Sequence, residues 1–184
     1  MRQPQKDDRI RKSPLKFYVY YYSELSGDCQ VSIFTELWRL SVAFCVTLWH
    51  MSIGARDIRG CIACYSCSKT GRCVFEDEVN QLAPKFEEAD GLVIASPVYY
   101  ASANATLIAC LDRLFYSTHF DKTMKVGASV AVARRGGCSA TFDELNKYFT
   151  ITGMPVASSQ YWNSVHGRNA GEALEDEEGL QTMR

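Results

Sequence analysis

Four cysteines in the middle of the chain have the spacing that most clearly indicates chemistry. They occur in the order Cys61-x2-Cys64-x2-Cys67-x5-Cys73. Three thiolates at successive three-residue steps can surround a compact inorganic core, and a fourth thiolate after a turn closes the site. This spacing is close to the ferredoxin-type run that binds a four-iron cluster. An iron-sulfur cluster is therefore the leading interpretation.

Two other interpretations of these cysteines stay open. Zinc is usually held by two separated pairs of ligands, which a single dense run fits less well. Reduced thiols can also pack as small apolar groups without a ligand. Lys69 and Arg72 lie within the run, where their charge would offset that of a negative cluster. The remaining cysteines are scattered and are expected to be core residues: Cys29, Cys45, Cys110 and Cys138.

Composition and charge exclude several classes of protein. The chain has 184 residues, of which 47% are apolar and 22% charged, which fits about one globular domain. The 20 Lys and Arg residues nearly balance the 21 Asp and Glu residues, so the net charge is -1. We therefore expect neither nucleic acid nor a membrane as partner. The longest uncharged apolar run, residues 40–53, is shorter than the roughly 20 residues of a membrane span and lies too far along the chain for a signal peptide. We expect a cytoplasmic protein with reduced thiols.

Beyond residue 78 the sequence alternates between apolar runs and helical periodicity. The runs at 91–95 and 125–133 are typical of strands buried on both faces of a parallel sheet, and a last strand is expected at 155–158. Helical spacing of apolar residues occurs at 79–89, where Pro84 must kink or start a helix, and at 104–115 and 140–152. The predicted fold class is α/β, an open, mostly parallel sheet with helices on both faces.

Two segments follow predicted strands and therefore belong to the edge where such sheets bind ligands. They are Ser96, Pro97, Val98, Tyr99 and Tyr100 in the first segment, and Arg134, Arg135, Gly136 and Gly137 in the second. Each segment precedes a predicted helix, so its N–H groups can bind an anion or an electron-rich ring edge. Position alone does not identify a ligand, because arginine pairs are also common in solvated turns.

Together with the cysteine run, residues 60–184 resemble the flavodoxin-like NADPH-dependent FMN reductase family, in particular its iron-sulfur flavoprotein branch. The resemblance covers about two thirds of the 184 residues and rests on several motifs in the right order. The motifs are Gly60-Cys61-Ile62-Ala63-Cys64 to Cys73, Ala89-Asp90-Gly91, Ser96-Pro97-Val98-Tyr99, Leu111-Asp112-Arg113, Arg134-Arg135-Gly136-Gly137 and residues 171–179.

The resemblance implies a flavodoxin-like fold with FMN at the strand ends, and an FMN-dependent oxidoreductase that receives electrons from NAD(P)H or a ferredoxin-like donor. By similarity, residues 96–100 would line the flavin ring and ribityl chain, and residues 134–137 would contact the pyrimidine end. Arg134 or Arg135 would there stabilise the negative charge of a reduced flavin. The family also implies assembly as a homo-oligomer, a dimer or tetramer.

The sequence leaves the catalytic residue unknown. Tyr99, Tyr100 and Trp162 could stack on a flavin, but a single aromatic residue is more often part of the core. His166 could donate a proton, although a lone histidine in a loop is more often solvated. Two functions therefore stay open. One is the oxidoreductase, and the alternative is a degenerate, non-catalytic metal-binding or interaction domain that has lost the flavin.

Residues 1–56 lack the family's pattern, and we separate this atypical segment from an FMN reductase domain at 57–184. The family holds the FMN phosphate in a Gly-Ser-Pro-Arg and Asn-Thr loop after the first strand, whereas Ser13-Pro14 precedes the candidate strand 16–22. Residues 33–49 fit a buried helix or a strand. The first strand and helix of the fold are therefore expected to be lost or aberrant. An upstream frame shift or fusion explains this better than divergence.

Overall fold

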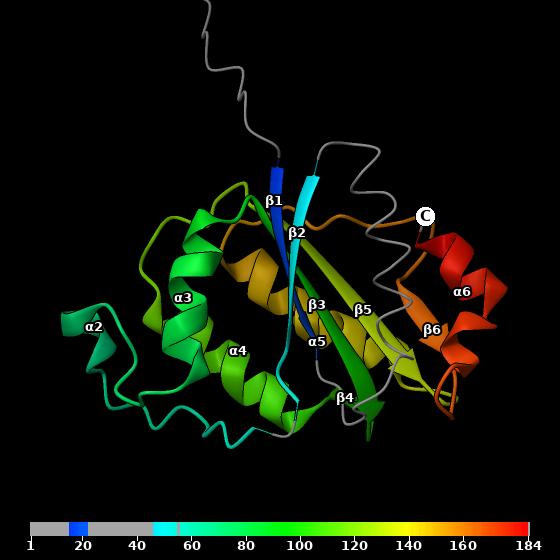
Figure 1. Cartoon of the computed structure of the whole chain (residues 1–184), viewed down its shortest axis with the longest axis horizontal. Helices are drawn as coiled ribbons and strands as arrows, with labels where there is room; N and C mark the ends of the chain where they lie inside the picture. The colour runs from blue at the N-terminus through cyan, green and yellow to red at the C-terminus, as the bar shows by residue number, and fades with distance from the viewer. Residues whose placement is uncertain (1–14, 22–45, 55, 184) are drawn as a thin grey trace, which may run out of the picture.

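The computed structural model of the chain describes residues 15–21, 46–54 and 56–183. At its centre lies a sheet whose strands follow the order β2-β1-β3-β5-β6 (Figure 1). The strands are β1 (Leu15–Tyr21), β2 (Val46–Ser52), β3 (Gly91–Tyr99), β4 (Ser102–Ala103), β5 (Val126–Ala133) and β6 (Ser164–His166). The helices are α2 (Cys67–Thr70), α3 (Glu78–Glu88), α4 (Ala105–Ser117), α5 (Cys138–Ile151), the 3-10 helix η1 (Glu172–Leu174) and α6 (Glu177–Thr182).

Pairing along the main path of the sheet is parallel throughout, and only β4 pairs antiparallel, with the end of β3. With the first strand between the second and the third, this is the doubly wound order of flavodoxin-like folds. The predicted α/β class is confirmed. The candidate strand at 16–22 corresponds to β1, which pairs with both β2 and β3. The first strand of the fold is therefore present, whereas the segment between β1 and β2 lies outside the described residues.

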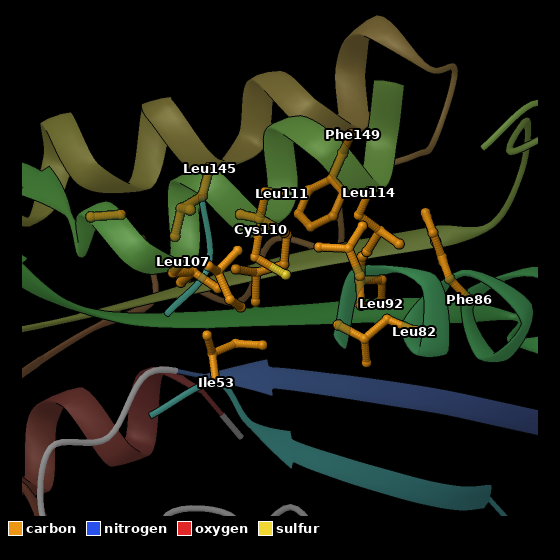
Figure 2. Close-up of a cluster of buried hydrophobic side chains, with 14 of the residues drawn as sticks. Ile53, Leu82, Phe86, Leu92, Leu107, Cys110, Leu111, Leu114, Leu145 and Phe149 are labelled. Atoms are coloured by element: carbon orange, nitrogen blue, oxygen red, sulfur yellow. The ribbon is translucent and has the colours of Figure 1, made fainter. Parts of the chain in front are cut away.

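The main core lies between one face of the sheet and the helices α3, α4 and α5 (Figure 2). Figure 2 shows Leu107 and Leu111 of α4 and Leu145 and Phe149 of α5 gathered over Leu92 of β3. Successive strand residues point to opposite faces, so Val93, next to Leu92, packs in a smaller cluster that includes Ala95, Val130 and Met183. None of the helices in the described ranges is long and apolar enough to cross a membrane.

The three helices predicted by periodicity are confirmed. Asn104 caps α4, because its side-chain oxygen accepts the N–H groups of Thr106 at 2.8 Å and Leu107 at 3.2 Å. Pro84 neither starts nor breaks a helix, since α3 runs unbroken from Glu78 to Glu88 with Pro84 on its exposed side. The expected alternative that Pro84 starts a new helix is therefore wrong, and apolar packing of α3 outweighs the lost N–H.

Strand β3 is longer than the predicted 91–95. It continues through Tyr99 because Val98 and Tyr99 pair with the two residues of β4. The turn between β3 and β4 holds Tyr100 and Ala101 in the left-handed region, at φ of 52° and 60°. Residues 96–100, expected to follow the strand, are therefore the end of β3 and the start of a tight hairpin turn.

The last strand is not at the predicted 155–158. Val156 makes only an isolated bridge with Gly127, and the outer strand is β6 instead. The N–H of Gly127 donates to the carbonyl of Pro155 at 2.9 Å, but Pro155 has no N–H with which to extend the pairing. His166, predicted in a loop, ends β6.

Gly127 of β5 supplies a test of how α5 packs on the sheet. A Cβ at this position would overlap the ring of Phe149. We expect Gly127→Ala to lower the free energy of unfolding by about 1–3 kcal/mol, because the buried ring has no room to move. Urea denaturation measures the change. Gly60→Ala, where a Cβ meets nothing within 4 Å, is the control. Equal midpoints for the two variants would contradict the packing.

Candidate functional site

The two segments predicted to bind a ligand lie next to each other at the carboxyl edge of the sheet. They follow β3 and β5, which are neighbouring parallel strands. Gly137 touches the turn after β3, since a Cβ there would lie 2.9 Å from both the Cα of Ala101 and the Cγ1 of Val98. Residues 96–100 and 134–137 therefore form one surface, named here the strand-end surface.

Side chains of the strand-end surface divide into exposed and structural groups. Tyr99, Tyr100, Arg134 and Arg135 are exposed and accessible to a ligand. Ser96 is 1% exposed and has a structural part, because its Oγ accepts the N–H of Asn104 at 2.9 Å. The sequence does not separate Ser96 from its neighbours, whereas the structure removes its side chain from the accessible set.

Glu144 of α5 holds the hairpin of the strand-end surface in place. Its carboxylate accepts the hydroxyl of Ser102 at 3.0 and 2.9 Å and the N–H of Ala103 at 2.8 Å. These bonds connect β4 to the helix that follows the arginine pair. Nothing in the sequence pattern singles out Glu144, because its partners lie 41 and 42 residues away.

The N-terminus of α5 is electrostatically suited to a negative group. Its N-cap is Gly137, at φ of 96°, and no described side chain caps the helix there. The first N–H groups of a helix carry partial positive charge and favour anions. Because Arg134 and Arg135 directly precede this helix, helix and side chains together favour negative charge at the strand-end surface. The N-terminus of α4 differs, since Asn104 already accepts its N–H groups.

The four clustered cysteines line one pocket beside α2 and α4. The described residues around this pocket also include Tyr65, Phe75, Arg113 and Tyr116. The pocket cysteines differ in exposure: Cys61 and Cys64 are exposed, Cys73 is partly buried and Cys67 is buried. Among the described residues, no three His, Cys, Asp or Glu side chains form a site for a single metal ion. Four thiols at one pocket are the kind of ligand set that an iron-sulfur cluster takes.

The backbone turns sharply to bring these cysteines together. Ala63 and Tyr65, on either side of Cys64, occupy the left-handed region at φ of 52° and 57°. This conformation costs about 1–2 kcal/mol for a residue with a side chain, and such strain is concentrated at functional sites. Gly71, at φ of 70°, then ends α2 and directs the chain toward Cys73.

Two side chains from outside the cysteine run hold Cys73. Asn80 of α3 accepts the N–H of Cys73 at 3.0 Å, and its amide donates to the carbonyl of Cys73 at 3.0 Å. Arg113 of α4 donates from Nε to the Sγ of Cys73 at 3.2 Å. Arg113 stands in a motif quoted for the family resemblance, but the sequence assigns it no contact. Asn80 carries no signal in the sequence.

The scattered cysteines that the structure describes are core residues, as predicted. Cys110 is a buried residue of α4, and burial raises the pKa of its thiol to about 12. Burial also raises the pKa of Cys138. Neither thiol is therefore a ready ligand or nucleophile at neutral pH. Cys29 and Cys45 lie outside the described residues.

Two further candidates lie near β6. Trp162 is half-exposed and stacks against Tyr161 with ring centroids 5.1 Å apart, so it is not a core residue. His166 is exposed, and its Nδ1 lies 3.4 Å from Asp176, which also accepts the N–H of His166 at 2.7 Å. Asp176 therefore fixes the end of β6. The loop in which the family holds the FMN phosphate would follow β1, in a segment outside the described residues.

Comparison with known proteins adds sequence relatives to this geometry. The model of the NADPH-dependent FMN reductase family matches residues 44–169. An iron-sulfur flavoprotein of Methanocaldococcus jannaschii is 32% identical over 142 residues, which are 73% of this chain and 74% of the relative. An iron-sulfur flavoprotein of Methanosarcina thermophila is 32% identical over 135 residues, which are 71% of this chain and 70% of the relative.

Solved structures share the fold at low sequence identity. The crystal structure of RosB with bound 8-demethyl-8-formylriboflavin-5'-phosphate matches with a TM-score of 0.71 and 16% identity, covering 92% of this chain and 73% of that one. The NAD(P)H:quinone oxidoreductase from Methanothermobacter marburgensis matches with a TM-score of 0.69 and 12% identity, covering 92% of each chain. At such identities the likeness concerns the fold alone.

The doubly wound sheet with its strand-end surface defines a flavodoxin-like protein. The family match, which covers more than half of the residues, makes the assignment specific: the chain belongs to the NADPH-dependent FMN reductase family. The resemblance noted from the motifs is thereby confirmed. An FMN-dependent oxidoreductase is the function that these relatives support, and the non-catalytic alternative is not favoured. The match begins ahead of the expected boundary at 57 and takes in β2.

Gly137 tests whether the strand-end surface holds the flavin. Gly137→Ala would place a methyl group 2.9 Å from Ala101 at a φ of 96° that side chains rarely adopt. We expect the affinity for FMN to fall at least tenfold, about 1.4 kcal/mol, because the two segments must separate. Fluorescence titration with FMN measures it. Gly60→Ala, which lies outside the strand-end surface and where a Cβ meets nothing within 4 Å, is the control. Equal affinities in both variants would place the flavin elsewhere.

Proposed function

We propose that the chain is an electron-transferring flavoprotein that carries both FMN and an iron-sulfur cluster, the latter held by Cys61, Cys64, Cys67 and Cys73. The observation that carries the proposal is the pocket that all four cysteines line. Iron-sulfur flavoproteins among the relatives support it. A bound cluster would supply one-electron chemistry, for which the cysteine thiolates are the ligands.

On this proposal the strand-end surface binds FMN, which supplies two-electron chemistry when bound. Arg134, Arg135 and the open N-terminus of α5 would stabilise negative charge on the reduced flavin. Exposed Tyr99 and Tyr100 offer aromatic faces to the ring. Glu144 keeps this surface in shape through its hydrogen bonds to the hairpin.

The electron donor is proposed to be NAD(P)H, by the name of the family, or a ferredoxin-like protein. Four exposed apolar side chains surround the cysteine pocket and suit contact with a redox partner or a second copy of the chain. They are Ile62, Tyr65, Val74 and Tyr116. A reducing compartment such as the cytoplasm would keep the pocket thiols free for iron.

Iron content tests the cluster. Protein purified anaerobically should be brown and contain about four irons per chain, and Cys64→Ser should lower the iron content sharply because a ligand is lost. Metal analysis and visible absorption measure both. Cys110→Ala removes a buried thiol outside the pocket and should leave the iron content unchanged. Iron-free protein after anaerobic reconstitution, or protein loaded with zinc, would contradict the assignment.

Substitution of Arg134 and Arg135 tests whether the pyrimidine end of the flavin lies against this pair. Replacing Arg134 and Arg135 together by Ala should lower the midpoint potential of bound FMN, because the reduced, more negative form loses two nearby positive charges. Spectroelectrochemistry of the FMN-loaded protein measures the potential. Lys147→Ala, an exposed charge farther along α5, is the matched control. A potential that moves equally in both variants would show only a general effect of charge.

A further inference from the structure

Arg113 of α4 is buried beneath the cysteine pocket, with 1% of its surface exposed. Its Nε donates to the Sγ of Cys73 at 3.2 Å. Its Nη atoms donate to the carboxylate of Asp77 at 2.6 and 2.8 Å, to the carbonyl of Arg59 at 3.1 Å and to the carbonyl of Phe75 at 3.5 Å. All five N–H donors of the guanidinium therefore have partners, and one of those partners is a sulfur.

An ion pair with Asp77 does not by itself explain this arrangement. The carboxylate occupies only the Nη side of the planar guanidinium, which leaves Nε to make a separate contact. That contact is with Cys73, the last residue of the cysteine run. A neutral thiol is a weak acceptor, but a sulfur that binds iron carries negative charge and accepts a hydrogen bond from a cation strongly. The geometry is therefore suited to the liganded state of the pocket.

Other cations of the cysteine run do not make this contact. Arg72 is exposed and pairs with Glu76 at 2.5 Å, and Lys69 is exposed on α2. In the part of the chain that the structure describes, Arg113 is the cation that donates to a sulfur of the run. Arg113 therefore adds a buried charge from another helix to the exposed charges of Lys69 and Arg72.

We propose that Arg113 is a positioning residue for the iron-sulfur cluster: it fixes the Sγ of Cys73 and, as a buried positive charge, raises the reduction potential of the cluster. The inference rests on the proposed function, since it requires that Cys73 is a ligand. Hydrogen bonds to the sulfurs and the net charge around a cluster are the means by which proteins set its potential. Asp77 opposes the effect, because it places a negative charge on the same guanidinium.

Single variants of Arg113 and Asp77 should shift the reduction potential of the cluster in opposite directions. Arg113→Gln should lower the ratio of reduced to oxidised cluster about tenfold at the same applied potential, which is about 59 mV for a one-electron couple. Asp77→Asn should raise this ratio. Asn still caps α3 as Asp77 does, so the variant removes charge and keeps the cap. A purely structural loosening of the pocket would not move the two ratios in opposite directions.

The experiment is spectroelectrochemical titration of the full chain after anaerobic reconstitution, with iron content measured on each sample. Arg113→Lys keeps the positive charge but loses the planar set of guanidinium donors. Its ratio of reduced to oxidised cluster should lie between those of the unchanged protein and Arg113→Gln. Arg72→Gln is the matched control, because it removes an exposed positive charge from the cysteine run itself. Its ratio should change least.

The outcomes separate the inference from the proposed function. An unchanged protein that takes up no iron would overturn both. An unchanged protein with its cluster, but with equal potentials in Arg113→Gln and Asp77→Asn or shifts of the same sign, would overturn only the role of Arg113. If Arg113→Gln retains no iron, Arg113→Lys and Asp77→Asn decide, and the inference fails unless Asp77→Asn raises the ratio.

Discussion

Parallel pairing of β3 with β5 is the constraint on which the strand-end surface depends. Because both strands run in the same direction, the residues that follow them meet at one edge, although they are far apart in the chain. Gly137 then allows the two segments to touch, since any side chain at that position would meet the backbone of Ala101. The exposed arginines, the exposed tyrosines and the open N-terminus of α5 all take their places from this contact.

Much of this architecture is predictable because apolar periodicity reports burial directly. The strands at 91–95 and 125–133 and the helices after them bury one or both faces, so their patterns are clear. The two residues of β4 are too few to form an apolar pattern in the sequence. The turn before β4 places Tyr100 and Ala101 in the left-handed region, which normally favours glycine or asparagine, because the two-residue connection between Tyr99 and Ser102 favours this conformation. Likewise β6 has three residues and only one buried apolar side chain.

The cysteine pocket shows a similar division. Its four cysteines are close in sequence, so their spacing alone predicts that they gather at one site. The residues that hold them are not close in sequence. Arg113 lies 40 residues from Cys73 and comes from a different helix, and a buried arginine looks in a sequence like any solvated charge. Contacts of this kind depend on how α3 and α4 pack, which local patterns do not specify.

Helix α4 also separates the two places where electrons would be held. Its N-terminal end lies beside the hairpin of β4, and its C-terminal residues Tyr116 and Ser117 line the cysteine pocket near α2 (Figure 1). With 13 residues, the helix is about 20 Å long at about 1.5 Å per residue. On the proposed function, an electron that moves between these two places within one molecule crosses roughly the length of this helix.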